Sequence, residues 1–348
     1  MSFKPTYTCL KCSAVAVFML ICLTGTAQYN FSSVDDFFKA NQKALGGNAA
    51  ILVFKDGKNI YKKETEDFTI KSRAPLGASS QWLTAALVMT FVDEGKLSLD
   101  ERVSVYIPIL ENYGKKYITL RHCLSQTMGI ADNSRSVTSI FDRKKFESLE
   151  EEINSFAKKE NAANPGASFT YGSMGLNIAA RVMEVVSKKR FEVLVKQRLF
   201  TPLEMKNSAF LSDDNAVNPS VGAESTAADY SNFLSMLLAK GMYKGLRILS
   251  EKSVAEMQTI QTSAATKKYS PAATQGFEYG LGNWILQDAA GKVTVTTAPS
   301  LSGSWPYIDY CHGYTCVLLS AKYLGDDKRN LFMELKKLLD AQVPAICP

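Results

Sequence analysis

The spacing of apolar and polar residues along the chain predicts an α+β protein. Apolar residues recur at helical spacing over residues 33–45, and two glycines follow as a terminator. Two strand-like runs come next, at 49–55 and 59–63, and the Asp56-Gly57 pair between them favours a hairpin. After a mostly helical stretch, short strands return and a closing helix follows. These late elements are expected at residues 284–286, 293–297, 305–308, 316–321 and 327–339.

The stretch from Pro75 to Leu99 predicts a buried helix around which the rest of the chain is organised. Ser79 or Ser80 can cap its start, and Gly95 can end it. Its apolar residues recur at helical spacing: Leu83, Leu87, Val88, Phe91 and Val92.

With 348 residues, of which 46% are hydrophobic and 21% charged, the chain can bury a full core. It suits one large domain or two interleaved ones. We expect the segments 28–97 and about 210–348 to form a sheet part, and residues from about 98 to 209 to form a helical part.

The first 27 residues resemble a secretory signal peptide. Lys4 and Lys11 precede an apolar run from residue 14 to residue 23, and small residues up to Ala27 offer a cleavage site. The alternative is a membrane anchor, although the run is well short of the ~20 residues that a span needs. Cys22 suggests a lipoprotein, but Ile21 before it is a poor fit to that processing. We therefore expect an exported protein, periplasmic or secreted, with no stable membrane span after cleavage.

The distribution of charge does not indicate a nucleic-acid partner. The formal net charge is +6, and removal of Lys4 and Lys11 leaves +4, spread along the chain.

Four cysteines remain after cleavage, which is an even number in an exported protein. Cys311 and Cys316 lie between two strand-like runs, at a separation that can place them across a hairpin, so this pair is the expected disulfide. Cys123 and Cys347 are left either as a second pair or as two buried thiols. With only His122 and His312 in the chain, a cysteine and histidine metal cage is disfavoured, and no cofactor is expected.

The sequence Trp82-Leu83-Thr84-Ala85-Ala86 resembles the active-site helix of the β-lactamase-related serine hydrolases, which include class C β-lactamases, D-alanyl-D-alanine peptidases and family VIII esterases. In that family the helix opens with S-x-x-K. An ungapped alignment places Ala78 at the serine position and Gln81 at the lysine position. An alanine has no nucleophile and a glutamine has no titratable nitrogen, so both halves of the pair are missing.

Other segments resemble the same family and extend the likeness from about residue 47 to residue 339. Residues 118–130 resemble I-T-L/I-R-H-L-L-S-H-T-S-G, with Gln126 in place of a histidine. Residues 222–250 resemble a structural pattern that ends in R-x-L-S. Residues 165–173 resemble P-G-x-x-F-x-Y-S/G-N/G, in which Tyr171 fits the family tyrosine and Ser173 stands where class C enzymes have asparagine. The resemblance implies a β-lactamase/transpeptidase-like fold, an antiparallel sheet flanked by helices with an inserted helical domain.

A third family box, K-T-G or H-x-G, reads Ala298-Pro299-Ser300-Leu301-Ser302-Gly303 here, without lysine or histidine. Ser300, Ser302 and Gly303, together with Tyr171, are candidates for a ligand cleft; exposed loop serines are the plainer interpretation. Two other signals favour structure over chemistry. His122 is expected to be a hydrogen-bonding residue, and Ser155-x-x-Lys158 is an S-x-x-K spelling far from the expected position.

Three functions follow from these patterns. The first is an exported homologue without acyl-serine chemistry, which keeps a cleft for a small acyl or peptide ligand. The second is a working esterase or β-lactam or peptide hydrolase that uses Ser79 or Ser80, although one residue along a helix turns a side chain by about 100°. The third is a purely structural or partner-binding role. The sequence does not indicate an oligomeric state.

Overall fold

The computed structural model describes residues 1–3, 29–131, 146–211, 215–263, 266–325 and 327–347. Apart from residues 1–3, the expected signal peptide and Cys9, Cys12 and Cys22 lie outside this range. No helix within it is long and apolar enough to cross a membrane.

An antiparallel seven-stranded sheet forms one part of the fold, in the order β10-β11-β12-β13-β14-β1-β2. The early hairpin joins the late strands because β1 pairs with β14, with Val53 opposite Cys316. Asp56 and Gly57 connect β1 to β2 with φ of 48° and 77°, the left-handed conformation that a tight hairpin turn requires. The strands are β1 (Ala49–Lys55), β2 (Lys58–Glu64), β10 (Glu278–Tyr279), β11 (Trp284–Gln287), β12 (Val293–Thr297), β13 (Ser304–Asp309) and β14 (Tyr314–Ser320).

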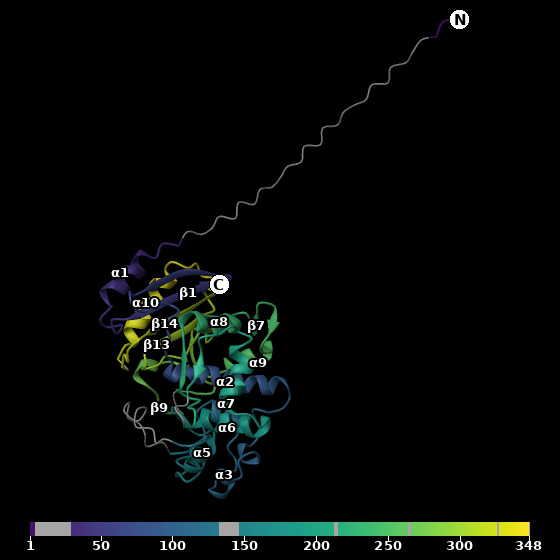
Figure 1. The fold of residues 1–348 in the computed structure, drawn as a ribbon, viewed down its shortest axis with the longest axis vertical. Helices are drawn as coiled ribbons and strands as arrows, with labels where there is room; N and C mark the ends of the chain where they lie inside the picture. The colour runs from purple at the N-terminus through teal and green to yellow at the C-terminus, as the bar shows by residue number, and fades with distance from the viewer. Residues whose placement is uncertain (4–28, 132–145, 212–214, 264–265, 326, 348) are drawn as a thin grey trace.

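Helices cover both faces of the sheet (Figure 1). Helices α1 (Ser32–Ala40) and α10 (Arg329–Asp340) contact each other, and their apolar residues join a core with the sheet. Helix α8 (Ala227–Leu238) contacts β1, β13 and β14 within a second, larger core.

Below the sheet in Figure 1 lies a mostly helical part. Helix α6 contacts α2, α4, α5 and α7, and it is buried along most of its length. The remaining helices, apart from α2, are α3 (Ile109–Asn112), α4 (Leu120–Leu124), α5 (Leu149–Ala157), α6 (Met174–Ser187), α7 (Phe191–Val195) and α9 (Glu251–Met257).

Short strands outside the large sheet form three small sheets, β3-β6-β5, β4-β9 and β7-β8. They are β3 (Ala74–Pro75), β4 (Phe169–Thr170), β5 (Ala209–Phe210), β6 (Ala223–Ser225), β7 (Met242–Tyr243), β8 (Leu246–Arg247) and β9 (Lys267–Tyr269).

Helix α2 (Ser80–Asp93) lies between the two parts, and the prediction of a buried central helix is confirmed. Every residue from Ser80 to Phe91 is buried. Gly95 follows the helix with φ of 67°, as expected for a terminating glycine. The expected serine cap is absent, because neither Ser79 nor Ser80 caps the helix with its side chain.

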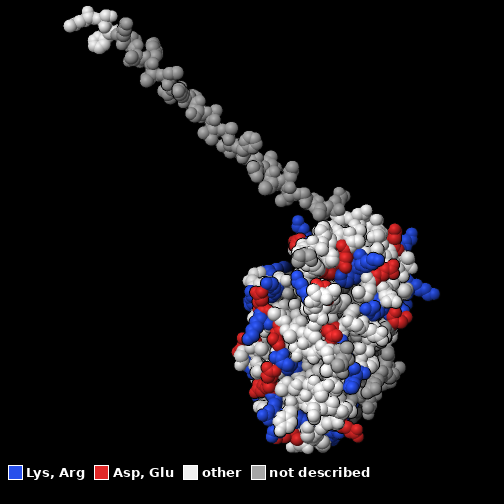
Figure 2. Space-filling view, turned by 180° about the vertical axis from the view of Figure 1, so that it is seen from behind, with Lys and Arg blue, Asp and Glu red and all other residues white. Residues whose placement is uncertain are grey.

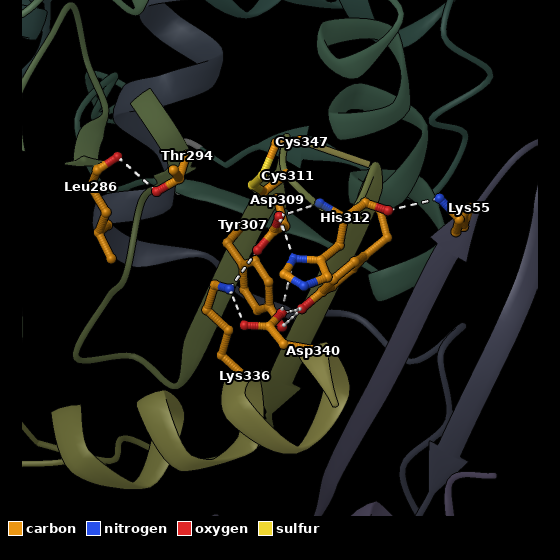
Figure 3. A network of polar contacts seen from close by, with 11 residues as sticks. Lys55, Leu286, Thr294, Tyr307, Asp309, Cys311, His312, Lys336, Asp340 and Cys347 are labelled. Carbon is orange, nitrogen blue, oxygen red and sulfur yellow. Dashed lines mark hydrogen bonds and ion pairs between the residues drawn. A yellow bond between two sulfur atoms is a disulfide. The ribbon is translucent and has the colours of Figure 1, made fainter. Parts of the chain in front are cut away.

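The disulfide prediction was wrong. Cys311 is bonded to Cys347, with a Cα–Cα distance of 4.9 Å (Figure 3). Cys316 and Cys123 are buried free thiols. The strand register explains the error. Cys316 lies inside β14 opposite Tyr307, whereas Cys311 lies in the turn beyond the last pair, Asp309 and Tyr314. The C-terminal segment reaches this turn after α10, and the Ile346 N–H donates to the Cys311 carbonyl at 2.7 Å.

The charged residues mix both signs over the face drawn in Figure 2.

Candidate functional site

Ala78 lies in a single 3₁₀ turn, Gly77–Ser79, that leads directly into α2. The residue is partly exposed, and its backbone N–H donates to Ser300 Oγ at 2.9 Å. The start of a helix leaves its first N–H groups without carbonyl partners in the helix. Here a side chain from the third family box accepts from one of these donors.

Ser79 and Ser80, the candidate substitute nucleophiles, are both completely buried. Ser79 Oγ donates to the Ala298 carbonyl and lies 2.6 Å from Ser304 Oγ. Ser80 Oγ faces another element and accepts from the Ala223 N–H at 3.1 Å. Each hydroxyl therefore joins α2 to a strand or its flank, and neither is presented to solvent.

Gln81 occupies the lysine position within a buried network of uncharged groups. Its Oε1 accepts from Tyr279 OH at 2.9 Å and from Gln126 Nε2 at 3.1 Å. Its Nε2 donates to the Gly172 carbonyl at 3.2 Å. Burial raises the pKa of Tyr279 well above its usual value, and the neighbouring Tyr171 adds to the effect. The phenol is therefore a neutral donor at physiological pH.

The Gly172 carbonyl fixes the orientation of both glutamine amides. Gln126 Nε2 also donates to it, at 2.9 Å, so each amide must turn its nitrogen toward this oxygen. As a result, Gln126 Oε1 is buried and accepts no hydrogen bond from the described residues. Gln126 also has φ of 61°, a conformation that few residues other than glycine adopt. Two departures from the family pattern, Gln81 and Gln126, thus contact each other directly.

Tyr171 lies beside this network. Its ring packs 5.8 Å from the ring of Tyr279 and 5.2 Å from that of Trp284, measured between centroids. Ser173 precedes α6, and its carbonyl accepts from Ser220 Oγ at 2.6 Å. Tyr171 is partly exposed, as are Gly172 and Ser173.

The third box packs against the turn before α2. Ser300 Oγ and Ser302 Oγ are 3.0 Å apart, and both approach Gly77 so closely that a Cβ there would lie 2.3 and 2.6 Å from them. Gly77 has φ of 51°. The structure therefore brings Ala78, Ser300 and Ser302 together, and Gly303 is buried at the end of the same loop.

The two other sequence signals have structural roles. Thr119 caps α4, and His122 completes the capping box because its Nδ1 accepts from the Thr119 N–H at 3.1 Å. Burial, with a smaller contribution from Arg121, lowers the pKa of His122, which keeps the imidazole neutral for this role. Ser155 Oγ donates to the Glu152 carbonyl within α5, and Lys158 is exposed.

A separate polar network lies where the β13–β14 turn meets α10 (Figure 3). Asp309 Oδ1 lies 3.0 Å from His312 Nδ1, and Asp340 Oδ1 lies 3.7 Å from the same nitrogen. These three atoms converge as metal ligands can. However, Lys336 Nζ donates to the other oxygen of both carboxylates and supplies a positive charge. The network therefore has its own cation and joins α10 to the sheet.

Sequence reasoning missed two members of the site. Tyr279 was not identified as a candidate, and Gln126 was identified only as a departure from the family pattern. Both contact Gln81, across 198 and 45 residues of sequence. The replacement of histidine by Gln126 was the one available signal.

Comparisons with known proteins agree with this architecture. A family model described as Beta-lactamase matches residues 34–336. Penicillin-binding protein 4 of Amycolatopsis lactamdurans is 27% identical over 282 residues, which cover 70% of this chain and 72% of that protein.

Two solved structures share the fold. A putative beta-lactamase from Bacteroides dorei has a TM-score of 0.77 and 24% identity, over 90% of this chain and 99% of that one. An octameric penicillin-binding protein homologue from Pyrococcus abyssi has a TM-score of 0.74 and 18% identity, over 90% of this chain and 79% of that one. With a family match over most of its length and the β-lactamase/transpeptidase-like fold, this chain belongs to the Beta-lactamase family of serine hydrolases.

Proposed function

We propose that this chain is an exported member of the family that has lost acyl-serine catalysis and keeps a cleft for a small acyl or peptide ligand. The observation that carries the proposal is the methyl group of Ala78 at the nucleophile position, one helical turn before the uncharged Gln81. A serine hydrolase needs an activated hydroxyl at this place, and removal of the nucleophile costs on the order of a million-fold in turnover.

The neighbouring serines do not supply a substitute. Ser79 and Ser80 are completely buried, and each makes hydrogen bonds that position α2. An attacking hydroxyl must reach the substrate and pass its proton to a base. The hydroxyls of these serines have Ala298, Ser304 and Ala223 as hydrogen-bond partners among the described residues, and none of these is a lysine or histidine.

A fluorophosphonate probe, a chromogenic ester and a chromogenic cephalosporin test the loss of catalysis. The purified protein should show no labelling and no turnover above the rate of heat-denatured protein. Ser79→Ala and Ser80→Ala are matched variants, and both should behave like the parent in these assays. Labelling that disappears in either variant would establish a non-standard nucleophile and defeat the proposal.

The retained cleft is tested by restoring the missing pair. In Ala78→Ser/Gln81→Lys the lysine amine is one turn from the new hydroxyl and can accept its proton. Gln126 Oε1 and the Gly172 carbonyl are acceptors beside residue 81. We expect measurable esterase activity from the double variant, and none from either single variant. A folded but inactive double variant would indicate that the cleft does not admit an ester.

Export is supported by the basic and apolar N-terminal pattern and by the Cys311–Cys347 disulfide, since such bonds persist in oxidising compartments. N-terminal sequencing of the protein from its native host should begin at Gln28. An intact Met1 in the cytoplasmic fraction would contradict export.

A further inference from the structure

The segment of residues 298–304 is joined by hydrogen bonds to the turn that opens α2. Ser304 Oγ donates to the Leu76 carbonyl at 2.7 Å, and Ser79 Oγ lies 2.6 Å from Ser304 Oγ. These two contacts are completely buried and hold the end of the segment. The contact from Ser300 Oγ to the Ala78 N–H is different, because it lies between two partly exposed residues at the candidate site.

The Ala78 N–H belongs to the residue at the nucleophile position itself. An acyl group bonded to the side chain of residue 78 would carry its oxygen near this N–H, and a donor placed there stabilises developing negative charge. The partial positive charge at the start of α2 adds to this effect. In the present chain the oxygen that accepts from the amide is Ser300 Oγ, at 2.9 Å.

The residues around the contact between Ser300 Oγ and the Ala78 N–H leave room for it. Gly77 has no side chain at a point where a Cβ would lie 2.3 Å from Ser300 Oγ. The Ser302 N–H donates to Ser300 Oγ at 3.2 Å, which helps hold the hydroxyl in place. Ser300 lies in the segment Ala298-Pro299-Ser300-Leu301-Ser302-Gly303, which stands in place of the family's third box and ends in glycine as both forms of that box do.

We propose that the Ser300 hydroxyl is an internal competitor for ligand oxygen at the Ala78 amide, so that the 298–304 segment holds the site closed to carboxylate and acyl oxygens. A ligand oxygen reaches the amide only when the Ser300 side chain rotates away. The inference rests on the proposed ligand cleft and adds a regulation of that same site. It requires no covalent step.

Backbone amide NMR of Ala78 tests the competition in the full-length protein, with acetate as the probe. Ser300→Ala removes the hydroxyl and keeps a side chain compatible with the loop. We expect exchange of the Ala78 amide hydrogen to become about tenfold faster in Ser300→Ala. The Ala78 resonance should also titrate with acetate in this variant, with an apparent affinity about tenfold above that of the parent protein.

Ser155→Ala is the control, because it removes the same hydroxyl from a serine whose Oγ donates to the Glu152 carbonyl within α5, outside the candidate site. It should leave both measurements within twofold of the parent. Unchanged amide exchange in Ser300→Ala, equal acetate affinity in parent and variant, or no acetate response in either would each overturn the competition. Failure of the proposed function is a separate result, since it would appear as probe labelling of the parent protein.

Discussion

Gln126 Nε2 donates a hydrogen bond to Gln81 Oε1 at 3.1 Å, and both residues replace ionisable residues of the family pattern. A lysine and a histidine side chain can each gain or lose a proton, whereas two amides can only donate and accept hydrogen bonds. The replacements are thus consistent with each other, because a lone glutamine beside a charged partner would leave that charge without compensation.

Substitutions of Gln81 and Gln126 are expected to have non-additive effects on the free energy of unfolding. Gln81→Ala and Gln126→Ala each remove hydrogen bonds from buried partners, at a cost of about 1–3 kcal/mol in the free energy of unfolding. The double variant should lose less than the sum of the two, by about 0.5–3 kcal/mol. Urea unfolding measures all three. The exposed Gln275→Ala is the control and should stay within about 0.5 kcal/mol. Additive losses would contradict the contact.

The disulfide should contribute strongly to stability, since it closes a loop with a sequence separation of 36. Cys347→Ala should lower the free energy of unfolding by about 2–4 kcal/mol. Reduction of the parent protein should cause a similar loss, and reduction of the variant should cause little more. Peptide mapping without reduction should recover a Cys311–Cys347 cross-link, and a Cys311–Cys316 cross-link would contradict the structure.

Lys336 is expected to be essential to the polar network where the β13–β14 turn meets α10. Its side chain is 13% exposed and contacts Asp309 and Asp340, so Lys336→Met leaves two carboxylates beside each other with one cation fewer. Loss of one partner of a buried ion pair costs about 3–5 kcal/mol. Lys328→Met is the control, because its partner Asp327 is 75% exposed, and it should cost less than about 1 kcal/mol. Similar losses in the two variants would contradict a buried network.

Asp309 should give the protein a measurable acid sensitivity. Burial alone raises the pKa of this carboxyl, but Lys336 and His312 outweigh burial and lower it below the usual value. A lowered folded-state pKa stabilises the fold above the unfolded value of about 3.9, and this stabilisation is lost as the pH falls through the folded-state pKa. Asp309→Asn should therefore be less stable at neutral pH and show a flatter decline below about pH 4. Equal acid slopes in thermal unfolding would contradict this assignment.

Local signals predicted much of the fold. Asp56-Gly57 indicated the hairpin, and apolar spacing predicted α2 and the late strands to within a few residues. The first helix ends at Ala40 rather than near Leu45. Asn41 at its C-cap has φ of −103° and ψ of 9°, outside the helical conformation, and its side chain donates to the Phe37 carbonyl at 3.0 Å.

Contacts between distant segments could not be predicted in this way. Cys347 follows α10, and nothing near Cys311 in the sequence indicates that the C-terminal segment returns to the turn. The direction of the Ser79 and Ser80 hydroxyls likewise depends on strands more than 140 residues away. The alignment placed Ala78 and Gln81, but only the structure relates them to Ser300, Gln126 and Tyr279.

The Gly172 carbonyl, which accepts from both glutamines, also bears on how this lineage can evolve. A mutation of Gln81 to lysine alone would insert an amine into a pocket arranged for two amides, and a serine at position 78 alone would have no base. If catalysis is lost as proposed, neither single substitution is expected to raise turnover, and Gln81→Lys also disturbs the buried hydrogen bonds around residue 81. Under the proposed function, a loss of catalysis that involves both positions is therefore not reversed by a single substitution.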